Sequence, residues 1–161
     1  MFILKGFPLP LPMKEEMEKL DIMPIKFSDI EDAFFFVSMG EMYMNSAILC
    51  IETGQIFYIS DFGDSDELPE DIDDDPDKYI EIPHKNELNL GKPLVLEFSA
   101  MYLSDNLEKV NSFFHKKGAY SKFKNLLESK GLLDKWYQFE EEEQNKALRE
   151  WLKENDIIIN S

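Results

Sequence analysis

The residues best suited to chemistry lie between Asp61 and Asp77, where ten carboxylates occur in seventeen residues without a lysine or an arginine. Carboxylate oxygens bind Mg²⁺ and Ca²⁺, but an EF-hand loop would need an acidic third position and a glutamate at the twelfth. Counted from Asp61, those positions hold Gly63 and Ile72. Because closely spaced carboxylates repel one another, we instead expect an exposed, mobile loop over residues 63–75, whose deletion leaves stability nearly unchanged.

A metal-assisted hydrolase is the alternative function, with carboxylates of residues 61–81 such as Asp61 and Asp77 as its ligands. Metal-dependent nucleases place a glutamate and a lysine two residues apart on one strand, so that both face the metal. Here Glu81 and Lys85 are four residues apart, and Pro83 lies between them. This spacing argues against a nuclease.

The histidines and the cysteine form no recognisable catalytic set. His84 and His115 are far apart and neither adjoins a serine or cysteine motif, so we expect both at the surface or at the core edge. Cys50 lies within an apolar run, where a packed thiol is expected. We therefore assign no catalytic, metal-binding or cofactor-binding residue, and the sequence favours a non-enzymatic protein.

The composition of the 161 residues indicates one domain with a core of its own. Apolar residues make up 43% of the chain and include 13 phenylalanines. The net charge of −16 disfavours binding to nucleic acid and to anionic membranes, and no apolar run reaches the length of a membrane span. One cysteine excludes an internal disulfide framework. These features predict a soluble cytoplasmic protein.

The first part of the chain predicts a helix followed by three strands. Residues 1–26 are rich in proline and are expected to form an irregular lead-in. A capping box opens a helix over residues 28–40. Apolar alternation around a glycine-containing turn predicts a hairpin over residues 45–60. A short strand at residues 78–82, closed by a proline, suits the edge of a sheet.

The rest of the chain predicts helices. Residues 92–102 are compatible with a helix or with a strand, and Pro93, which suits a first helical turn, favours the helix. Apolar spacing indicates helices at residues 106–115 and 119–129, and Gly131 is the expected C-terminal cap of the second.

Beyond Leu132 the apolar stripe is interrupted by the polar residues Glu140, Glu141 and Gln144. We therefore predict a short helix to about residue 138, a kink near Phe139 and a second helix that ends at Asn155. Residues 157–159 are expected to return to the sheet as a final short strand.

Together these elements predict an α+β fold in one domain over residues 1–161. Residues 27–103 supply a helix and a small antiparallel sheet, which packs against a C-terminal cluster of about four helices in residues 104–161. Eight apolar residues are expected in one core: Phe34, Leu49, Ile51, Phe57, Phe123, Leu127, Trp136 and Trp151.

Charge is divided between the two parts of the chain. Residues 1–103 hold 7 basic and 22 acidic residues, whereas residues 109–135 hold seven lysines and two acidic residues. We expect a binding or regulatory protein whose acidic region engages a basic protein partner by charge complementarity, with a basic helical stripe as a second surface. The predicted interaction surface comprises Asp61, Asp64, Asp66, Glu67, Asp73, Asp74, Asp75, Asp77, Lys116, Lys117, Lys122 and Lys124.

A longer pattern of glycine, aromatic and apolar residues runs through the C-terminal half and the hairpin. Its residues are Ile51-Glu52-Thr53-Gly54, Ile82-Pro83, Gly118-Ala119-Tyr120, Phe123-Lys124, Leu127, Gly131-Leu132, Trp136-Tyr137-x-Phe139, Ala147, Trp151-Leu152 and Asn155-x-Ile157. Over roughly residues 47–158 the chain resembles a widespread bacterial family of uncharacterised proteins without an assigned activity. The resemblance implies no catalytic residue.

Overall fold

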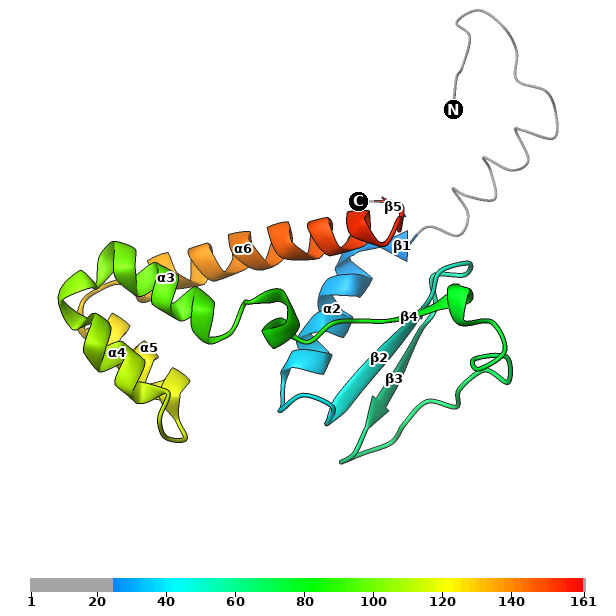
Figure 1. Ribbon diagram of the computed structural model, residues 1–161, viewed down its shortest axis with the longest axis horizontal. Helices are drawn as coiled ribbons and strands as arrows, with labels where there is room; N and C mark the ends of the chain where they lie inside the picture. Colours follow the sequence, from blue (N-terminus) through cyan, green and yellow to red (C-terminus); the bar gives the residue numbers. More distant parts are fainter. Residues whose placement is uncertain (1–24, 161) are drawn as a thin grey trace, which may run out of the picture.

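A computed structural model describes residues 25–160 of the chain (Figure 1). Within these residues, five α-helices accompany a three-stranded antiparallel sheet and a two-stranded parallel pair, which confirms the α+β class. The sheet and α2 (Phe27–Ser38) lie at one end of the long axis. At the other end lie three helices, α3 (Lys92–Tyr102), α4 (Leu107–Phe113) and α5 (Ala119–Ser129). Helix α6 (Leu133–Glu154) extends from the helical end to the sheet end.

The antiparallel sheet has the strand order β3-β2-β4. Strand β2 (Asn45–Cys50) pairs with β3 (Ile56–Ser60) and with β4 (Tyr79–Glu81). The predicted hairpin is confirmed, and so is the place of the third strand at a sheet edge.

Side-chain alternation decides which hairpin residues enter the core. Ala47 and Leu49 are fully buried on one face of the sheet. Phe57 pairs with Ile48, so it lies half-buried on the opposite face. Its predicted place in the core is therefore wrong.

The core joins both ends of the molecule. Of the other predicted core residues, five are buried in one cluster, and Ile51 and Trp151 pack against it while partly buried. The five are Phe34, Leu49, Phe123, Leu127 and Trp136. At the helical end, the rings of Phe98, Phe123 and Trp136 meet edge to face with centroids 5.0, 5.3 and 6.4 Å apart.

Helix α6 is continuous, so the kink predicted near Phe139 is wrong. Glu140, which interrupts the apolar stripe, is half-buried and interacts electrostatically with Lys124 of α5 and with Lys85. Charged residues on other elements therefore accommodate a polar residue on the inner face of α6. Local sequence preference alone does not decide whether the helix is continuous.

Two predictions near the chain ends need correction. Helix α2 begins at Phe27 with Lys26 as its N-cap, so the capping box is wrong. The reason is that Lys26 belongs to β1 (Ile25–Lys26), which leads directly into the helix. Strand β1 pairs in parallel with β5 (Ile159–Asn160), so the final strand forms apart from the main sheet. The remainder of the predicted lead-in lies outside the described residues.

None of the described helices combines the length and the apolar character that a membrane crossing requires.

Candidate interaction surfaces

The loop between β3 and β4 is fastened to the outer edge of β3 by two side chains. The Tyr58 N–H donates to Asp66 Oδ2 at 2.8 Å, and the Asp66 N–H donates to the Tyr58 carbonyl at 2.8 Å. Two residues farther along β3, the Ser60 N–H donates to Ser65 Oγ at 3.1 Å, and the Ser65 hydroxyl donates to the Ser60 carbonyl at 3.3 Å. These bonds satisfy edge groups that would otherwise be open to another strand.

A second attachment lies farther along the loop at Asp71. Lys78 Nζ lies 2.8 Å from Asp71 Oδ2, and the Tyr79 hydroxyl donates to Asp71 Oδ1 at 2.6 Å. These hydrogen bonds, from Lys78 first and then from Tyr79, hold the pKa of the Asp71 carboxyl below its ordinary value. Lys78 also lies 3.6 Å from Glu52 Oε2. Although residues 61–77 contain no lysine or arginine, Lys78 directly after them therefore compensates one carboxylate of the loop.

The other carboxylates of the loop face solvent, as the sequence predicts. Within residues 25–160, both ion pairs involve Lys78, and neither reaches these residues. Of the predicted acidic residues, Asp66 is exposed but serves as an attachment. We call the remaining exposed set the acidic surface: Asp61, Asp64, Glu67, Glu70, Asp73, Asp74, Asp75 and Asp77.

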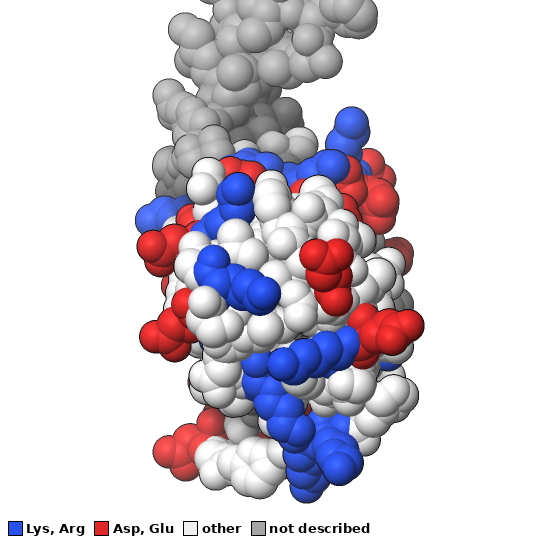
Figure 2. Space-filling model, turned by 90° about the vertical axis from the view of Figure 1, so that its left-hand side faces the viewer, with Lys and Arg blue, Asp and Glu red and all other residues white. Residues whose placement is uncertain are grey.

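The predicted basic residues lie at the opposite end of the molecule, on α5 and on the turn that precedes it. Figure 2 shows this end as a largely uncharged surface crossed by basic side chains, with one acidic side chain within it and the other carboxylates towards its margins. Lys124 Nζ lies 5.6 Å from the Tyr137 ring centroid, and Lys135 Nζ lies 4.3 Å from that of Tyr102. We call the exposed set on α4, α5, α6 and their connections the lysine surface: Lys109, Lys116, Lys117, Lys122, Lys124, Lys130 and Lys135.

Between the two ends lies a group of ionisable residues from three separate segments. Lys85, in the 3₁₀ turn Lys85–Leu88, holds its Nζ 4.4 Å from the ring centroid of Tyr120 on α5. Burial lowers the pKa of Lys85 and raises the pKa of Tyr120 and of Glu140 on α6. Such opposed shifts occur at functional sites and in structural charge networks alike. No local pattern could predict this group, because its members are far apart in the sequence.

His84 and Cys50 have surroundings that suit packing roles, whereas His115 does not. His84 is buried rather than at the surface, with Nδ1 accepting from the Asn86 N–H at 3.0 Å and Nε2 lying 2.8 Å from the Gly40 carbonyl. It thus links the segment after α2 to the 3₁₀ turn. His115 is exposed, and Cys50 is buried.

Candidate metal ligands do not converge in the described part of the chain. Between residues 25 and 160, no three histidine, cysteine, aspartate or glutamate side chains are close enough to hold a metal ion. Asp61 and Asp77, the ligands considered for a hydrolase, are both exposed.

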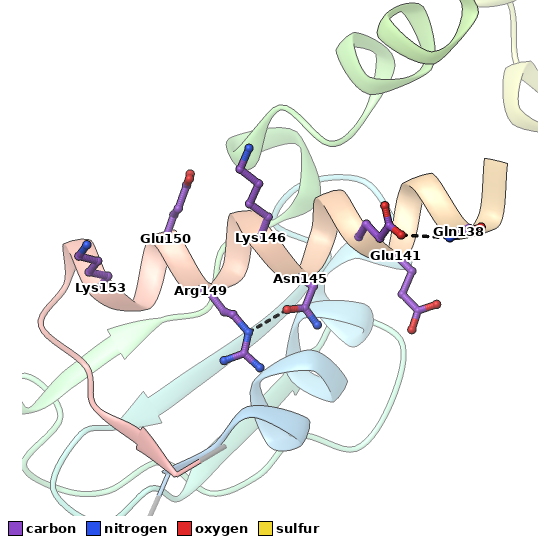
Figure 3. A pocket seen from close by; sticks show the side chains of 8 residues that line it. Gln138, Glu141, Asn145, Lys146, Arg149, Glu150 and Lys153 are labelled. Carbon is purple, nitrogen blue, oxygen red and sulfur yellow. Dashed lines mark hydrogen bonds between the residues drawn. The ribbon is translucent and has the colours of Figure 1, made fainter. Parts of the chain in front are cut away.

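A hollow of about 740 Å³ follows one face of α6 from Gln138 to Lys153 (Figure 3). Its described lining comes from that helix alone and consists of charged and amide side chains. Arg149 Nε donates to Asn145 Oδ1 at 2.8 Å, and its guanidinium lies 4.0 Å from the Phe27 ring centroid. Arg149 is therefore engaged by its own neighbours.

Comparison with known proteins gives one match. The model described as "Uncharacterised protein family (UPF0158)" matches residues 25–160. Comparisons with curated proteins and with solved structures found no match. The match spans the strands, the acidic loop and all the described helices, and it confirms the family that the glycine and aromatic pattern indicates. The chain therefore belongs to this uncharacterised protein family.

Proposed function

We propose that the protein is a non-enzymatic binding or regulatory protein that engages a basic protein partner through its acidic surface. One observation supports this proposal above all: the loop between β3 and β4 is attached to the sheet, while most of its carboxylates are exposed to solvent. Asp66 and Asp71 are fastened to the sheet, while the carboxylates around them have no ion-pair partner within residues 25–160.

Two physical consequences favour binding. Unpaired carboxylates on one surface attract a partner that presents lysines or arginines, which raises the association rate and selects against acidic proteins. Attachment at two points also restricts the loop before binding, so less conformational entropy is lost when a partner arrives.

The experiment is a pull-down from cell extract with the purified chain as bait, at low and at high salt. Because surface charges are screened by salt, we expect a basic protein to be retained only at low salt. The variant D73N/D74N/D75N should lose that protein. The control variant E141Q/E150Q/E154Q removes the same number of exposed carboxylates from α6 and should retain it. Equal recovery by both variants would refute the proposal.

The alternative, a metal-assisted hydrolase that uses Asp61 and Asp77, has a separate test. A protein that binds Mg²⁺ or Mn²⁺ in the folded state melts at a higher temperature when the ion is added. We expect no such rise. A rise that disappears in Asp61→Asn or Asp77→Asn would favour the hydrolase.

A further inference from the structure

The lysine surface is a second charged region, and the proposed function does not account for it. Residues 109–135 hold seven lysines and only two acidic residues in a chain whose net charge is −16. Across the described residues, the ion pairs all involve Lys78, so none of the seven lysines of the lysine surface forms an ion pair there, and only Lys124 is attracted to a nearby carboxylate, that of Glu140. An exposed group of unneutralised cations attracts an anionic partner.

The aromatic residues beside these lysines indicate which anion fits. Tyr102 and Tyr137 are 42% and 43% exposed, as residues that stack on nucleic-acid bases often are. Here, however, Lys135 and Lys124 lie over their ring faces, at 4.3 and 5.6 Å from the ring centroids. One face of each ring is therefore occupied by a lysine, and that lysine is itself exposed to an anionic partner. The arrangement favours an acidic protein surface over nucleic acid.

This chain itself carries an acidic surface that matches those requirements. Its carboxylates are exposed, unpaired within residues 25–160, and fastened through Asp66 and Asp71. The loop that carries it lies at the sheet end of the long axis, and the lysine surface lies at the helical end (Figure 1). One molecule cannot bring its own two surfaces together.

We propose that the lysine surface binds the acidic surface of a second copy of this chain. Each contact joins two different surfaces, so every pair leaves one acidic and one lysine surface free for further copies. The overall negative charge opposes association at long range, but charges more than a Debye length apart, about 8 Å at physiological ionic strength, are largely screened. The facing surfaces therefore control the contact.

The test is sedimentation velocity of the full chain at rising concentration, at about 50 and about 500 mM NaCl. We expect the wild type to associate at low salt and to be monomeric at high salt. D73N/D74N/D75N and K116Q/K117Q/K122Q should each be monomeric alone, because each lacks one surface. Their mixture should form a dimer that contains one of each and does not grow. This complementation also shows that both variants fold.

The control variant K26Q/K146Q/K153Q removes three exposed lysines from elsewhere and should associate as the wild type does. A wild type that is monomeric at low salt, a mixture that fails to pair, or a lysine surface that binds a labelled oligonucleotide while the chain stays monomeric would overturn the inference. Its failure is separable from that of the proposed function, because K116Q/K117Q/K122Q retains the acidic surface and can serve as bait for a different basic protein.

Discussion

Gly131 ends α5 with a φ of 69°, a left-handed conformation that glycine adopts far more easily than other residues. Its N–H donates to the Glu128 carbonyl at 3.1 Å, and the Leu132 N–H donates to the Leu127 carbonyl at 2.8 Å. Among the described residues, apart from Gly131 itself and its two neighbours in the chain, no atom lies within 4 Å of the position that a Cβ would take. Gly131→Ala therefore acts through the backbone, and we expect denaturant unfolding to show a loss of about 1–2 kcal/mol.

Gly63 is the matched control for that substitution. It also has open space around a Cβ among the described residues, but its φ is not positive. Gly63→Ala should change the free energy of unfolding by less than about 0.5 kcal/mol. Equal losses in the two variants would show that the backbone conformation of Gly131 is not the cause.

Glu140 makes a pH-dependent contribution to stability. Burial raises the pKa of its carboxyl, and Lys124 and Lys85 reduce that effect. A carboxyl whose pKa is higher in the folded state stabilises the fold at low pH, and this contribution is lost as the pH rises through the folded-state value. Glu140→Gln keeps the side chain neutral at every pH.

We therefore expect the Tm of Glu140→Gln to exceed that of the wild type at neutral pH, and to equal it below the pKa of an unperturbed glutamate. Thermal melts over a pH series measure this difference. A variant that is less stable at neutral pH would show that attraction to Lys85 and Lys124 outweighs the burial of the carboxylate.

These two residues show what the sequence can predict at this scale. The role of Gly131 follows from a local rule, because a glycine after an apolar helical stripe is typical of a helix end. The group at Lys85, Tyr120 and Glu140 depends on how three distant segments meet. The sequence shows Tyr120 in the aromatic pattern and Glu140 as a break in an apolar stripe, but no local rule brings either residue together with Lys85.

At the scale of elements, the hairpin and α5 follow from local patterns, whereas α3 is favoured only by the proline in its first turn. In the hairpin and in α5, apolar residues recur with the period of a strand or of a helix, and glycine residues mark the turn and the helix ends. The kink predicted in α6 is wrong, and Glu140, which interrupts its apolar stripe, has charged partners on other elements. Likewise the acidic loop is exposed as predicted, but its attachments at Asp66 and Asp71 depend on side chains meeting the edge of the sheet.

The attachment at Asp66 yields a prediction for the loop and β3. Asp66→Ala removes the acceptor of the Tyr58 N–H, so we expect a loss of about 0.5–1.5 kcal/mol in the free energy of unfolding. Amide exchange at Tyr58 should also become faster, because the edge of β3 is then open.

Asp64→Ala is the control, since Asp64 is exposed on the same loop and belongs to the acidic surface. It should leave both measurements unchanged. If Asp66→Ala behaves in the same way, the loop contributes nothing to the sheet, in agreement with the expectation from the sequence alone.

At the scale of the whole molecule, both charged surfaces can be predicted from residue counts, but their arrangement cannot. The sequence shows an acidic segment followed by a lysine-rich one. Only the fold places them at opposite ends, because the sheet packs against α2 near one end of α6, whereas α3, α4 and α5 lie near the other end (Figure 1). This separation makes each surface available to a partner independently of the other.

The most direct test of the central claim is the affinity of the recovered basic partner for the purified chain, measured by titration calorimetry over a salt series. The wild type should bind more weakly as salt increases, because the contact is between surface charges. D73N/D74N/D75N should bind at least about tenfold more weakly than the wild type at low salt, which corresponds to about 1.4 kcal/mol. E141Q/E150Q/E154Q should bind as the wild type does. An affinity that is unchanged in D73N/D74N/D75N, or that does not depend on salt, would contradict the acidic surface as the binding site.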